Sequence, residues 1–464
     1  MEELVAISPV DGRYAKDVSA LSGRFSEFAF IKYRIRIEVE YLVALSEAGV
    51  IRKLTVHERR FLRKLHQKFS LDEAKRIKEI ERRTRHDVKA IEYYIKEVTG
   101  KSSLEDLKCY VHFGLTSEDV NNLAYSCMLR DTLSQEYLPV IIQLEENLIK
   151  LAEKYKAVPM LSRTHGQPAS PTTLGKEFVN FAARIVRELR KLDTKLPGKL
   201  NGAVGNYSAL HFACPNKDWI QFSTNFISSL GLEPELITSQ VIPHDKISEL
   251  LHTVFRINNI VINLDRDMWQ YLSYGYFRQT VLKDEVGSST MPHKVSPVDL
   301  ENSEGNLEVA NSLINLLAGK LQITRLQRDL SDSTVKRNYG LAFAHSIIAL
   351  KNTIEGLDRV HPDAGIMKEE LLKHPEVLTE AFQTVLKTQR YEAAFEDLKQ
   401  STRGKKISLQ HIHGYIKNIK MESRVRKRLL ALTPEQYLGL SVELTELGIK
   451  ECKGVLSSFE HKTS

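Results

Sequence analysis

The sequence feature that most constrains the fold is a long stretch, from His244 to Tyr274, that contains neither proline nor glycine. Apolar residues recur along it at every third or fourth position, which places them on one face of a single helix. These residues are Leu250, Val254, Ile257, Val261, Leu264, Met268 and Leu272. At about 1.5 Å of rise per residue this helix would be about 45 Å long, well above the usual length in globular proteins. The stretch predicts a fold built around long helices.

Two further segments repeat this pattern. Apolar residues at helical spacing occupy residues 174–196, which end before Pro197, and residues 141–158, which lie between Pro139 and Pro159. Proline is tolerated at the start of a helix and disrupts its interior, so these prolines fit helix boundaries. Three long amphipathic helices predict a helical bundle, and their apolar faces are expected to form its core rather than a site.

Strand signals are few, so we predict a mainly α fold. The best candidates are the short segments 5–10 and 200–207. We divide the chain into three domains. An N-terminal helical domain spans residues 1–108, a central long-helix bundle spans 109–356, and a small helical domain spans 357–464, where the sequence is more charged and its helical segments are shorter.

Composition narrows the function classes. Hydrophobic residues make up 42% of the chain and charged residues 27%, which is ordinary for a soluble protein. The net charge of +7 is spread along the chain, so we expect no nucleic-acid binding. We expect no signal peptide and no membrane span, because the chain has neither a suitable N-terminal segment nor a long apolar run. The four cysteines are far apart and form no CxxC pair. This favours a reducing, cytoplasmic location without a zinc site.

Polar segments between the helices are the places where chemistry is expected. ISPVDGRY (residues 7–14) reads as a turn or a helix entry. In TRHDVKA (84–90), three consecutive polar residues would converge on a ligand only at a helix terminus. HFGLTSEDVNN (112–122) resembles a helix N-cap with acidic residues in the first turn, and such an N-terminus also binds anions. Both interpretations of this last segment stay open.

Two more segments carry titratable or nucleophilic groups. In SRTHGQPASP (162–171), His165 is expected in a turn between two long helices, where a structural role and proton transfer are both open. GSSTMPHKVSP (287–297) holds two serines next to Gly287, and Lys294 follows them. A mobile loop of this kind supplies a base and a positive charge, which a reaction that removes a proton next to a carboxylate requires.

Taken together, TSED, RTHGQPA and GSSTMPHK, in this order on a mostly helical chain, resemble the fumarase/aspartase superfamily. The flanking segments SPVDGRY, HDVKAIEYY, IPHDKISEL and RDLSDSTVKRN resemble its adenylosuccinate lyase branch in the bacterial form. This resemblance implies a three-domain fold, a homotetramer with a shared core of long helices, and active sites built from three chains. It implies that fumarate is eliminated from adenylosuccinate, giving AMP, and from the succinyl-carboxamide ribotide SAICAR, giving AICAR, in purine biosynthesis. The partners are then small nucleotide substrates, and no metal or other cofactor is implied.

The resemblance also implies roles for individual residues. Ser288 matches the base that removes the proton from the succinyl Cβ, with Ser289 as the alternative serine. His165 matches the acid that protonates the leaving nitrogen, and Glu301 the carboxylate that orients it. Lys294 would stabilise the aci-carboxylate intermediate.

The remaining positions that match the family are expected to bind the substrate. The pair that would hold a succinyl carboxylate is Thr116 and Ser117. The residues that resemble nucleotide and phosphate contacts are Arg13, Tyr14, Arg85, His86 and Asp87. The other substrate-binding positions are Gln240, Asn302, Arg328, Ser333 and Arg337. Arginine suits phosphate and carboxylate groups because its planar fork binds them with two hydrogen bonds.

The chain departs from the family pattern at Ser296, where asparagine is expected. Serine is shorter and offers one hydroxyl, and the loss of one substrate hydrogen bond costs about 0.5–1.5 kcal/mol. Ser296 is the feature that supports one alternative, a related fumarate-releasing lyase with a shifted substrate. A second alternative is a non-catalytic structural relative. Retention of Ser288, His165, Lys294 and Glu301 argues against it.

Overall fold

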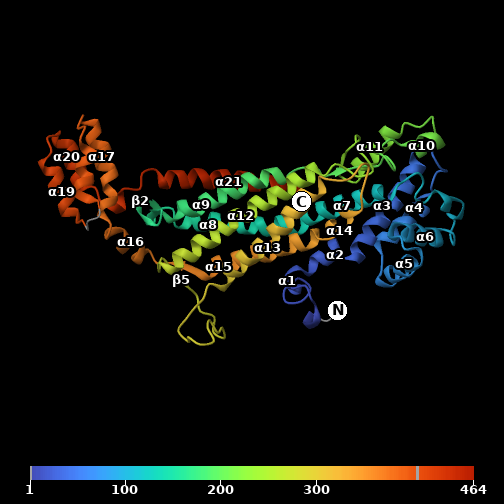
Figure 1. Cartoon of the computed structure of the whole chain (residues 1–464), viewed down its shortest axis with the longest axis horizontal. Helices are drawn as coiled ribbons and strands as arrows, with labels where there is room; N and C mark the ends of the chain where they lie inside the picture. The colour runs from blue at the N-terminus through green and yellow to red at the C-terminus, as the bar shows by residue number, and fades with distance from the viewer. Residues whose placement is uncertain (1–2, 404–406, 464) are drawn as a thin grey trace. The chain divides into compact units, whose positions relative to one another are not determined.

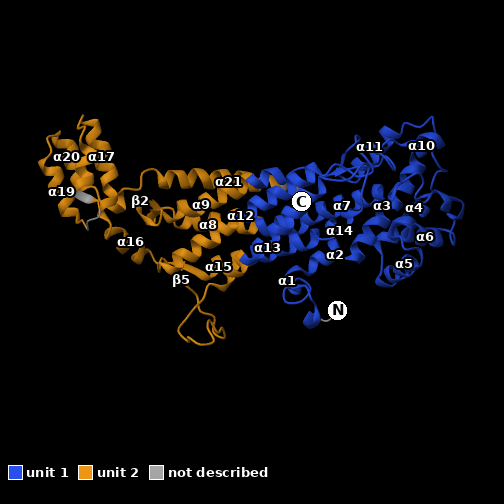
Figure 2. Cartoon of the chain, in the orientation of Figure 1, with its two compact units in different colours: residues 1–141, 188–259, 305–351 blue, residues 142–187, 260–304, 352–464 orange. Residues whose placement is uncertain are grey.

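The computed structural model describes residues 3–403 and 407–463, and most of them are helical (Figure 1). The prediction of a mainly α fold is confirmed. The chain forms two compact units, each assembled from three segments (Figure 2). Unit 1 holds residues 1–141, 188–259 and 305–351, and unit 2 holds residues 142–187, 260–304 and 352–464. The division into three consecutive domains stays a prediction.

Unit 1 contains the helices that precede α8 and three short helices from later in the chain. Its complete α-helices are α1 (Ala15–Val18), α2 (Ser22–Phe25), α3 (Glu27–Glu47), α4 (Val56–Gln67), α5 (Leu71–Thr84), α6 (Asp87–Thr99), α7 (Ser117–Thr132), α10 (Ser208–Ala213), α11 (Trp219–Ser229) and α14 (Ser331–Lys336). Short 3-10 turns are η1 (Glu3–Val5), η2 (Ser19–Leu21) and η3 (Glu105–Tyr110), and η4 (Leu133–Tyr137) is a π-helical turn. Strands β3 (Pro197–Gly198) and β4 (Glu233–Pro234) pair in parallel.

Unit 2 contains two antiparallel strand pairs and the C-terminal helices. The strands are β1 (Pro159–Thr164) with β2 (Gln167–Thr173), and β5 (Phe277–Gln279) with β6 (Val360–Pro362). The helices are α16 (Ala364–Leu372), η5 (Pro375–Leu378), α17 (Thr379–Thr388), α18 (Ala394–Thr402), α19 (Leu409–Asn418), α20 (Ser423–Ala431), η6 (Pro434–Gln436) and α21 (Ser441–Thr463). The boundaries between the units fall inside or at the edges of α8 (Leu138–Lys154), α9 (Leu174–Leu192), α12 (Asp245–Ser273), α13 (Val298–Leu321) and α15 (Tyr339–Arg359).

The long-helix prediction is confirmed. Helix α12 covers nearly the whole stretch that lacks proline and glycine, and the predicted apolar residues from Leu250 to Met268 are buried. The apolar face of α9 is buried as well, from Leu174 to Leu192. Burial of their apolar faces, rather than helix propensity, supplies most of the free energy that stabilises amphipathic helices such as α9 and α12.

The predicted boundary at Pro139 is wrong. Helix α7 continues through the π-helical turn η4 into α8, and Pro139 is the second residue of α8. Proline has no N–H, so the regular hydrogen bond to the residue four positions earlier is missing at this point. The chain accommodates this gap by a local π-turn and keeps the helical direction.

The two predicted strands are also wrong. The segment 5–10 forms the end of η1 and a series of turns, in which the N–H groups of Asp11 and Gly12 both bond to the carbonyl of Ser8. The segment 200–207 forms turns in which Gly202 and Gly205 have φ values of 84° and 73°. Left-handed glycines turn the backbone away from the extended conformation that a strand needs.

A compact apolar cluster in unit 2 holds the β1–β2 pair against the C-terminal helices. Leu161 of β1 is buried with residues from α16 to α20, which include Leu371, Phe382, Leu398 and Ile416. The hairpin that carries His165 is therefore supported by a packed core on one side.

None of the helices among the described residues combines the length and the apolarity that a membrane span requires.

Candidate active site

The predicted site residues divide between the two units. Those on unit 1 are Arg13, Tyr14, Arg85, His86, Asp87, Thr116, Ser117, Gln240, Arg328, Ser333 and Arg337. Those on unit 2 are His165, Ser288, Ser289, Lys294, Ser296, Glu301 and Asn302. The residues with predicted roles in proton transfer thus lie on unit 2, and most of the predicted binding residues lie on unit 1.

On unit 1, the TRHD segment lies at the junction of α5 and α6, which is the condition under which its polar residues could converge on a ligand. Arg85 caps the C-terminus of α5 with a left-handed φ of 53°. His86 is the N-cap of α6, and its Nδ1 accepts a hydrogen bond from the main-chain N–H of Lys89 at 3.2 Å. The side chains of Arg85 and His86 are exposed, next to the positive end of α6. This arrangement suits an anionic ligand.

Arginines from distant segments surround Asp87, the first residue of α6. Arg34 Nη2 donates to Asp87 Oδ2 at 2.7 Å, and Arg337 Nη2 lies 3.9 Å from the same oxygen. Burial would raise the pKa of Asp87, but the charge and hydrogen bond of Arg34 and the main-chain N–H of Val88 together outweigh it, and the net shift is downward. Arg337 also pairs with Glu27 at 2.7 Å and remains 44% exposed. The structure thus brings an exposed arginine to the N-terminus of α6, which is typical of phosphate sites.

The N-terminus of α7 begins as predicted, with Thr116 as its N-cap and Ser117 as its first residue. Asp119 Oδ2 accepts a hydrogen bond from the main-chain N–H of Thr116 at 2.9 Å. Glu118 and Asp119 are buried, although acidic residues in a first turn are usually solvent-exposed. Each of them binds a cation, and Glu118 pairs with Lys336 Nζ at 2.9 Å.

Glu118 also connects α7 with two predicted binding residues. Arg328 Nη2 lies 3.3 Å from Glu118 Oε2, and Arg328 Nη1 lies 3.5 Å from Gln240 Oε1. The structure therefore brings the TSED segment, Gln240 and Arg328 together, although they are far apart in the sequence. Ser333 is half-buried in the short helix α14.

Arg13 and Tyr14 lie in the turn that precedes α1. The main-chain N–H of Tyr14 bonds to the carbonyl of Pro9 at 2.9 Å, which confirms SPVDGRY as a turn that enters a helix. The guanidinium carbon of Arg13 is 5.9 Å from the centre of the Tyr14 ring. The Arg13 side chain is exposed.

On unit 2, His165 occupies the turn between α8 and α9, as predicted, and this turn belongs to the β1–β2 hairpin. Thr164 pairs with Gln167, which leaves His165 and Gly166 as a two-residue loop with φ values of 54° and 73°. Two positive φ values are typical of a type I′ turn, where asparagine is the usual first residue. Histidine in this conformation is strained, and such strain is often found at functional sites. The His165 side chain is exposed.

The loop between β5 and α13 carries the two serines. Ser288 Oγ accepts hydrogen bonds from the main-chain N–H groups of Met291 at 3.0 Å and Thr290 at 3.3 Å. Ser289 Oγ has a weaker contact, with Thr290 Oγ1 at 3.5 Å. The Lys294 side chain is exposed. Two N–H groups that point at one oxygen favour negative charge on it, so the two serines have different environments.

Glu301 and Asn302 lie in the first turn of α13. Glu301 Oε1 accepts a hydrogen bond from Trp269 Nε1 at 3.0 Å. No hydrogen bond joins Glu301 to His165 within the described part of this single chain, so the predicted orienting role stays a prediction. Nearby, Ser303 shares a 2.7 Å hydrogen bond with Thr353, which fixes α13 against α15.

His112, on unit 1, is a polar residue next to the TSED segment that was not predicted from the sequence as a site residue. It lies just before α7 with a left-handed φ of 64°, and its Nδ1 is 2.5 Å from the buried Glu38 Oε1. Burial would lower the pKa of His112, but the Glu38 carboxylate outweighs it and the pKa is raised. A usable signal was its position at the start of HFGLTSED.

Lys199 is the second residue that was missed. It is fully buried and pairs with Asp119. It is the only charged residue between Pro197 and Tyr207 in the sequence, which was the available signal.

Across the described residues, no cluster of three or more histidine, cysteine or acidic side chains has the arrangement of a metal site.

Comparison with known proteins agrees with these features. The model of a family described as "Lyase" matches residues 12–310, and the model described as "Adenylosuccinate lyase C-terminal" matches residues 324–438. The adenylosuccinate lyase of Legionella pneumophila (strain Corby) is 44% identical over 448 residues, which cover 96% of this chain and 98% of that protein. The adenylosuccinate lyase of Escherichia coli (strain K12) is 42% identical over 451 residues, which cover 96% and 99%.

Solved structures show the same fold at low sequence identity. The fumarate lyase from Mesorhizobium sp. BNC1 has a TM-score of 0.75 and 16% identity, with coverage of 93% of this chain and 97% of that chain. The 3-carboxy-cis,cis-muconate lactonizing enzyme from Pseudomonas putida has a TM-score of 0.73 and 19% identity, with coverage of 94% and 97%. The chain therefore belongs to the fumarase/aspartase superfamily of lyases and, within it, to the adenylosuccinate lyases, as the sequence motifs predicted.

Proposed function

We propose that this chain eliminates fumarate from adenylosuccinate to give AMP, and from SAICAR to give AICAR. The observation that carries the proposal is the similarity to proteins named adenylosuccinate lyase, at 42–44% identity over 96% of the chain. The structure adds support, because the motif residues lie in loops, turns and helix termini instead of inside the helical core.

Ser288 is the proposed base. Elimination begins when its oxygen takes the proton from the succinyl Cβ, which requires the serine to be available in its deprotonated form. The two main-chain N–H groups at 3.0 and 3.3 Å favour that form. Ser289 has no comparable pair of donors in the described structure. This difference supports Ser288 over the alternative serine.

His165 is the proposed acid, and Lys294 the proposed electrostatic partner. As the Cα–N bond of the succinyl group breaks, its electrons pass to the leaving nitrogen, which takes a proton from His165. The proton taken from Cβ stays on Ser288 until it returns to solvent. Lys294 offsets the negative charge that builds up on the carboxylate next to Cβ before the bond breaks. Exposure of His165 and Lys294 is consistent with groups that meet a substrate.

Unit 1 supplies the proposed binding groups. Thr116 and Ser117 are the proposed carboxylate-binding pair, which their position at the N-terminus of α7 supports, because the positive end of a helix favours an anion. The nucleotide phosphate is assigned to the N-terminus of α6 with Arg85 and Arg337. Both arginines are exposed, and Arg337 lies within 3.9 Å of Asp87 at that terminus.

We also propose that the protein acts as a cytoplasmic homotetramer in which each active site combines residues from three chains. Exposed apolar side chains support assembly. Leu440, the residue before α21, and Leu444 and Leu447 within it lie at helical spacing and are 65%, 49% and 64% exposed. Val309 and Leu316 on α13 are 45% and 50% exposed. Apolar groups on long helices usually bury their surface against another subunit. The three-domain division is part of the same proposal.

The test is fumarate release by the purified protein from adenylosuccinate and SAICAR, beside a His165→Ala variant. We expect turnover of both substrates by the wild type and a large loss in the variant. Turnover of a different succinyl compound, with none of either ribotide, would indicate a lyase with a shifted substrate. No turnover of any succinyl compound by a folded tetramer would indicate a structural relative and would contradict the proposal.

A further inference from the structure

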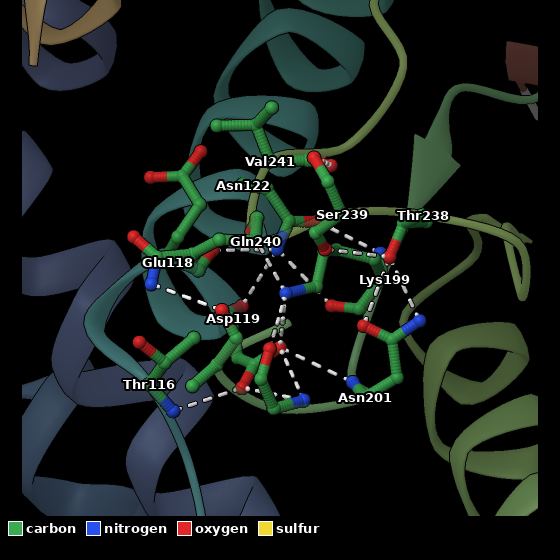
Figure 3. Close-up of polar contacts among 12 residues, drawn as sticks. Thr116, Glu118, Asp119, Asn122, Lys199, Asn201, Thr238, Ser239, Gln240 and Val241 are labelled. Carbon is green, nitrogen blue, oxygen red and sulfur yellow. Dashed lines mark hydrogen bonds and ion pairs between the residues drawn. The ribbon is translucent and has the colours of Figure 1, made fainter. Parts of the chain in front are cut away.

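Lys199 on unit 1 has all three of its hydrogen-bond donors engaged inside the protein. Its Nζ lies 3.0 Å from Asp119 Oδ1, 2.9 Å from the carbonyl oxygen of Gly202 and 2.8 Å from the carbonyl oxygen of Gln240 (Figure 3). Its side chain is 0% exposed. An ammonium group has three N–H donors and no acceptor, so none is left for a ligand. Lys199 cannot act by touching the substrate, and any role it has must pass through its partners.

Its ion-pair partner Asp119 gathers a second set of groups. The Asp119 carboxylate accepts hydrogen bonds from the main-chain N–H groups of Thr116 at 2.9 Å, Asn201 at 3.2 Å and Gly202 at 3.2 Å. One buried ion pair therefore joins three segments that are distant in the sequence: the turn before α7, the turns after β3, and the segment that contains Gln240 (Figure 3). Two of these segments carry predicted substrate-binding residues.

Gln240 is held at both ends. Lys199 binds its main-chain carbonyl, and its side-chain Nε2 donates to the carbonyl of Ala203 at 3.0 Å. Its remaining group, Oε1, lies 3.5 Å from Arg328, which Glu118 holds in turn at 3.3 Å. Both adjacent acids of the TSED segment thus reach Gln240 through a cation. Asp119 pairs with Lys199, which binds the main-chain carbonyl of Gln240, and Glu118 pairs with Arg328, which contacts its side chain.

A buried charge pair is costly to desolvate and is a weak source of stability on its own. Here every donor of the lysine and most acceptor positions of the carboxylate are satisfied, which is the condition under which such a network holds one geometry. A site that is already ordered before the ligand arrives loses less entropy on binding.

We propose that Lys199 and Asp119 are positioning residues, which fix Gln240 and the Thr116–Ser117 turn in the arrangement that binds the substrate. The inference rests on the proposed function only for the choice of substrate in the assay. It assigns the TSED segment two separate tasks: Thr116 and Ser117 face the ligand, whereas Glu118 and Asp119 organise the protein around it.

The first experiment compares Lys199→Met, Asp119→Asn and the double variant in steady-state assays with adenylosuccinate and in thermal unfolding. Lys199→Met leaves a buried carboxylate unpaired, so we expect it to lose stability and to raise KM by about ten-fold or more. The double variant removes the unpaired charge, and its stability should recover. The Gln240 carbonyl still has no lysine to hold it, so KM should stay raised. Recovery of KM together with stability would overturn the proposal.

A control and a double-mutant cycle separate positioning from general destabilisation. Glu58→Gln removes another buried carboxylate, which binds Arg52 at 2.8 Å and no predicted site residue, so it should lower stability and leave KM unchanged. Gln240→Ala should raise KM alone, and Lys199→Met should add little to it, because both changes act through Gln240. Simple additivity of the two effects would count against the proposal.

A measurement on the wild-type protein does not depend on any variant folding. The N–H groups of Thr116, Asn201 and Gly202, which bind Asp119, should be strongly protected from hydrogen exchange in the ligand-free tetramer. Exchange at the rate of exposed loops would show that the segments are not preorganised and would overturn the proposal. Absence of any lyase turnover by the wild type, with these groups protected, would contradict the proposed function and leave the ordering itself intact.

Discussion

Ser296 Oγ donates a hydrogen bond to the main-chain carbonyl of Gly287, at 3.3 Å, and joins the two ends of the loop that carries Ser288. The chain approaches itself closely here, since a Cβ on Gly287 would lie 2.2 Å from the carbonyl oxygen of Lys294. The serine that departs from the family pattern thus has a role within the loop itself. Its hydrogen bond ties together the two ends of the loop that holds Ser288, the proposed base, and Lys294, the proposed electrostatic partner.

Ser296→Ala should lower kcat/KM, because the bond that closes the loop is lost. A hydrogen bond worth about 0.5–1.5 kcal/mol corresponds to roughly 2- to 13-fold in rate. Ser296→Asn should stay close to the wild type, because the asparagine amide also has a donor for the Gly287 carbonyl. Steady-state fumarate release measures both variants. An alanine variant as active as the wild type would show that this bond does not matter for turnover.

Ser288→Ala should reduce kcat by about 10²- to 10⁴-fold, the usual contribution of a positioned general base. Ser289→Ala is the matched control, since it removes the same hydroxyl from the neighbouring position, and it should retain most of the activity. Single-turnover assays, with the enzyme in excess over adenylosuccinate, measure the chemical step directly. The reverse pattern, with Ser289→Ala inactive, would assign the base to the second serine.

His112 and Glu38 make the stability of the protein depend on pH. The folded-state pKa of His112 is raised above its ordinary value of about 6.5. The pair therefore stabilises the fold fully below that value and loses its contribution as the pH rises through the folded-state pKa. Glu38→Gln should lower the thermal midpoint more at about pH 5 than at about pH 9.

The pKa of His112 should also fall in Glu38→Gln, because burial is then opposed only by the charges of Glu92 and Asp119. Nuclear magnetic resonance titration of the histidine ring measures this shift. Glu47→Gln, at an exposed carboxylate on the same helix, is the control and should change neither quantity. An equal loss of stability at both pH values would mean that Glu38 supports the fold without the charge of His112.

Glu145 is a buried carboxyl group that works against stability at neutral pH. It is 0% exposed, and neither of its oxygens has a hydrogen-bond partner among the described residues. Burial raises its pKa well above the ordinary value. The unfolded chain releases this proton above about pH 4.3 and the folded chain keeps it, so stability falls as the pH rises from there toward the folded-state pKa.

Glu145→Gln should therefore increase the free energy of unfolding at about pH 8 by about 1.4 kcal/mol for each unit by which the pKa is raised, and change it little at about pH 4. Urea unfolding of the purified protein at both pH values measures the difference. Glu146→Gln, at the exposed neighbouring position, is the control. A variant less stable than the wild type at high pH would show that the Glu145 carboxylate is ionised in the folded protein and is paired with a hydrogen-bond donor or a cation.

Much of the fold and the position of the motifs were predictable from the sequence alone. Helical periodicity identified α9 and α12, because an amphipathic helix must bury its apolar face whatever it packs against. Local signals also placed His165 in a turn and Thr116 at the start of a helix, because glycine, proline and capping residues act on the backbone within a few positions. The family followed from three short motifs in a set order.

The partners of the charged residues were decided only by the tertiary structure. Nothing local to Lys199 indicates that it meets Asp119, and nothing local to His112 indicates Glu38. These pairs form between segments that are distant in the sequence, and a charge is buried only where packing brings it an opposite charge and enough hydrogen-bond partners. A sequence pattern determines which face of a helix is apolar. Which polar groups meet beneath that face depends on how the helices are arranged around one another.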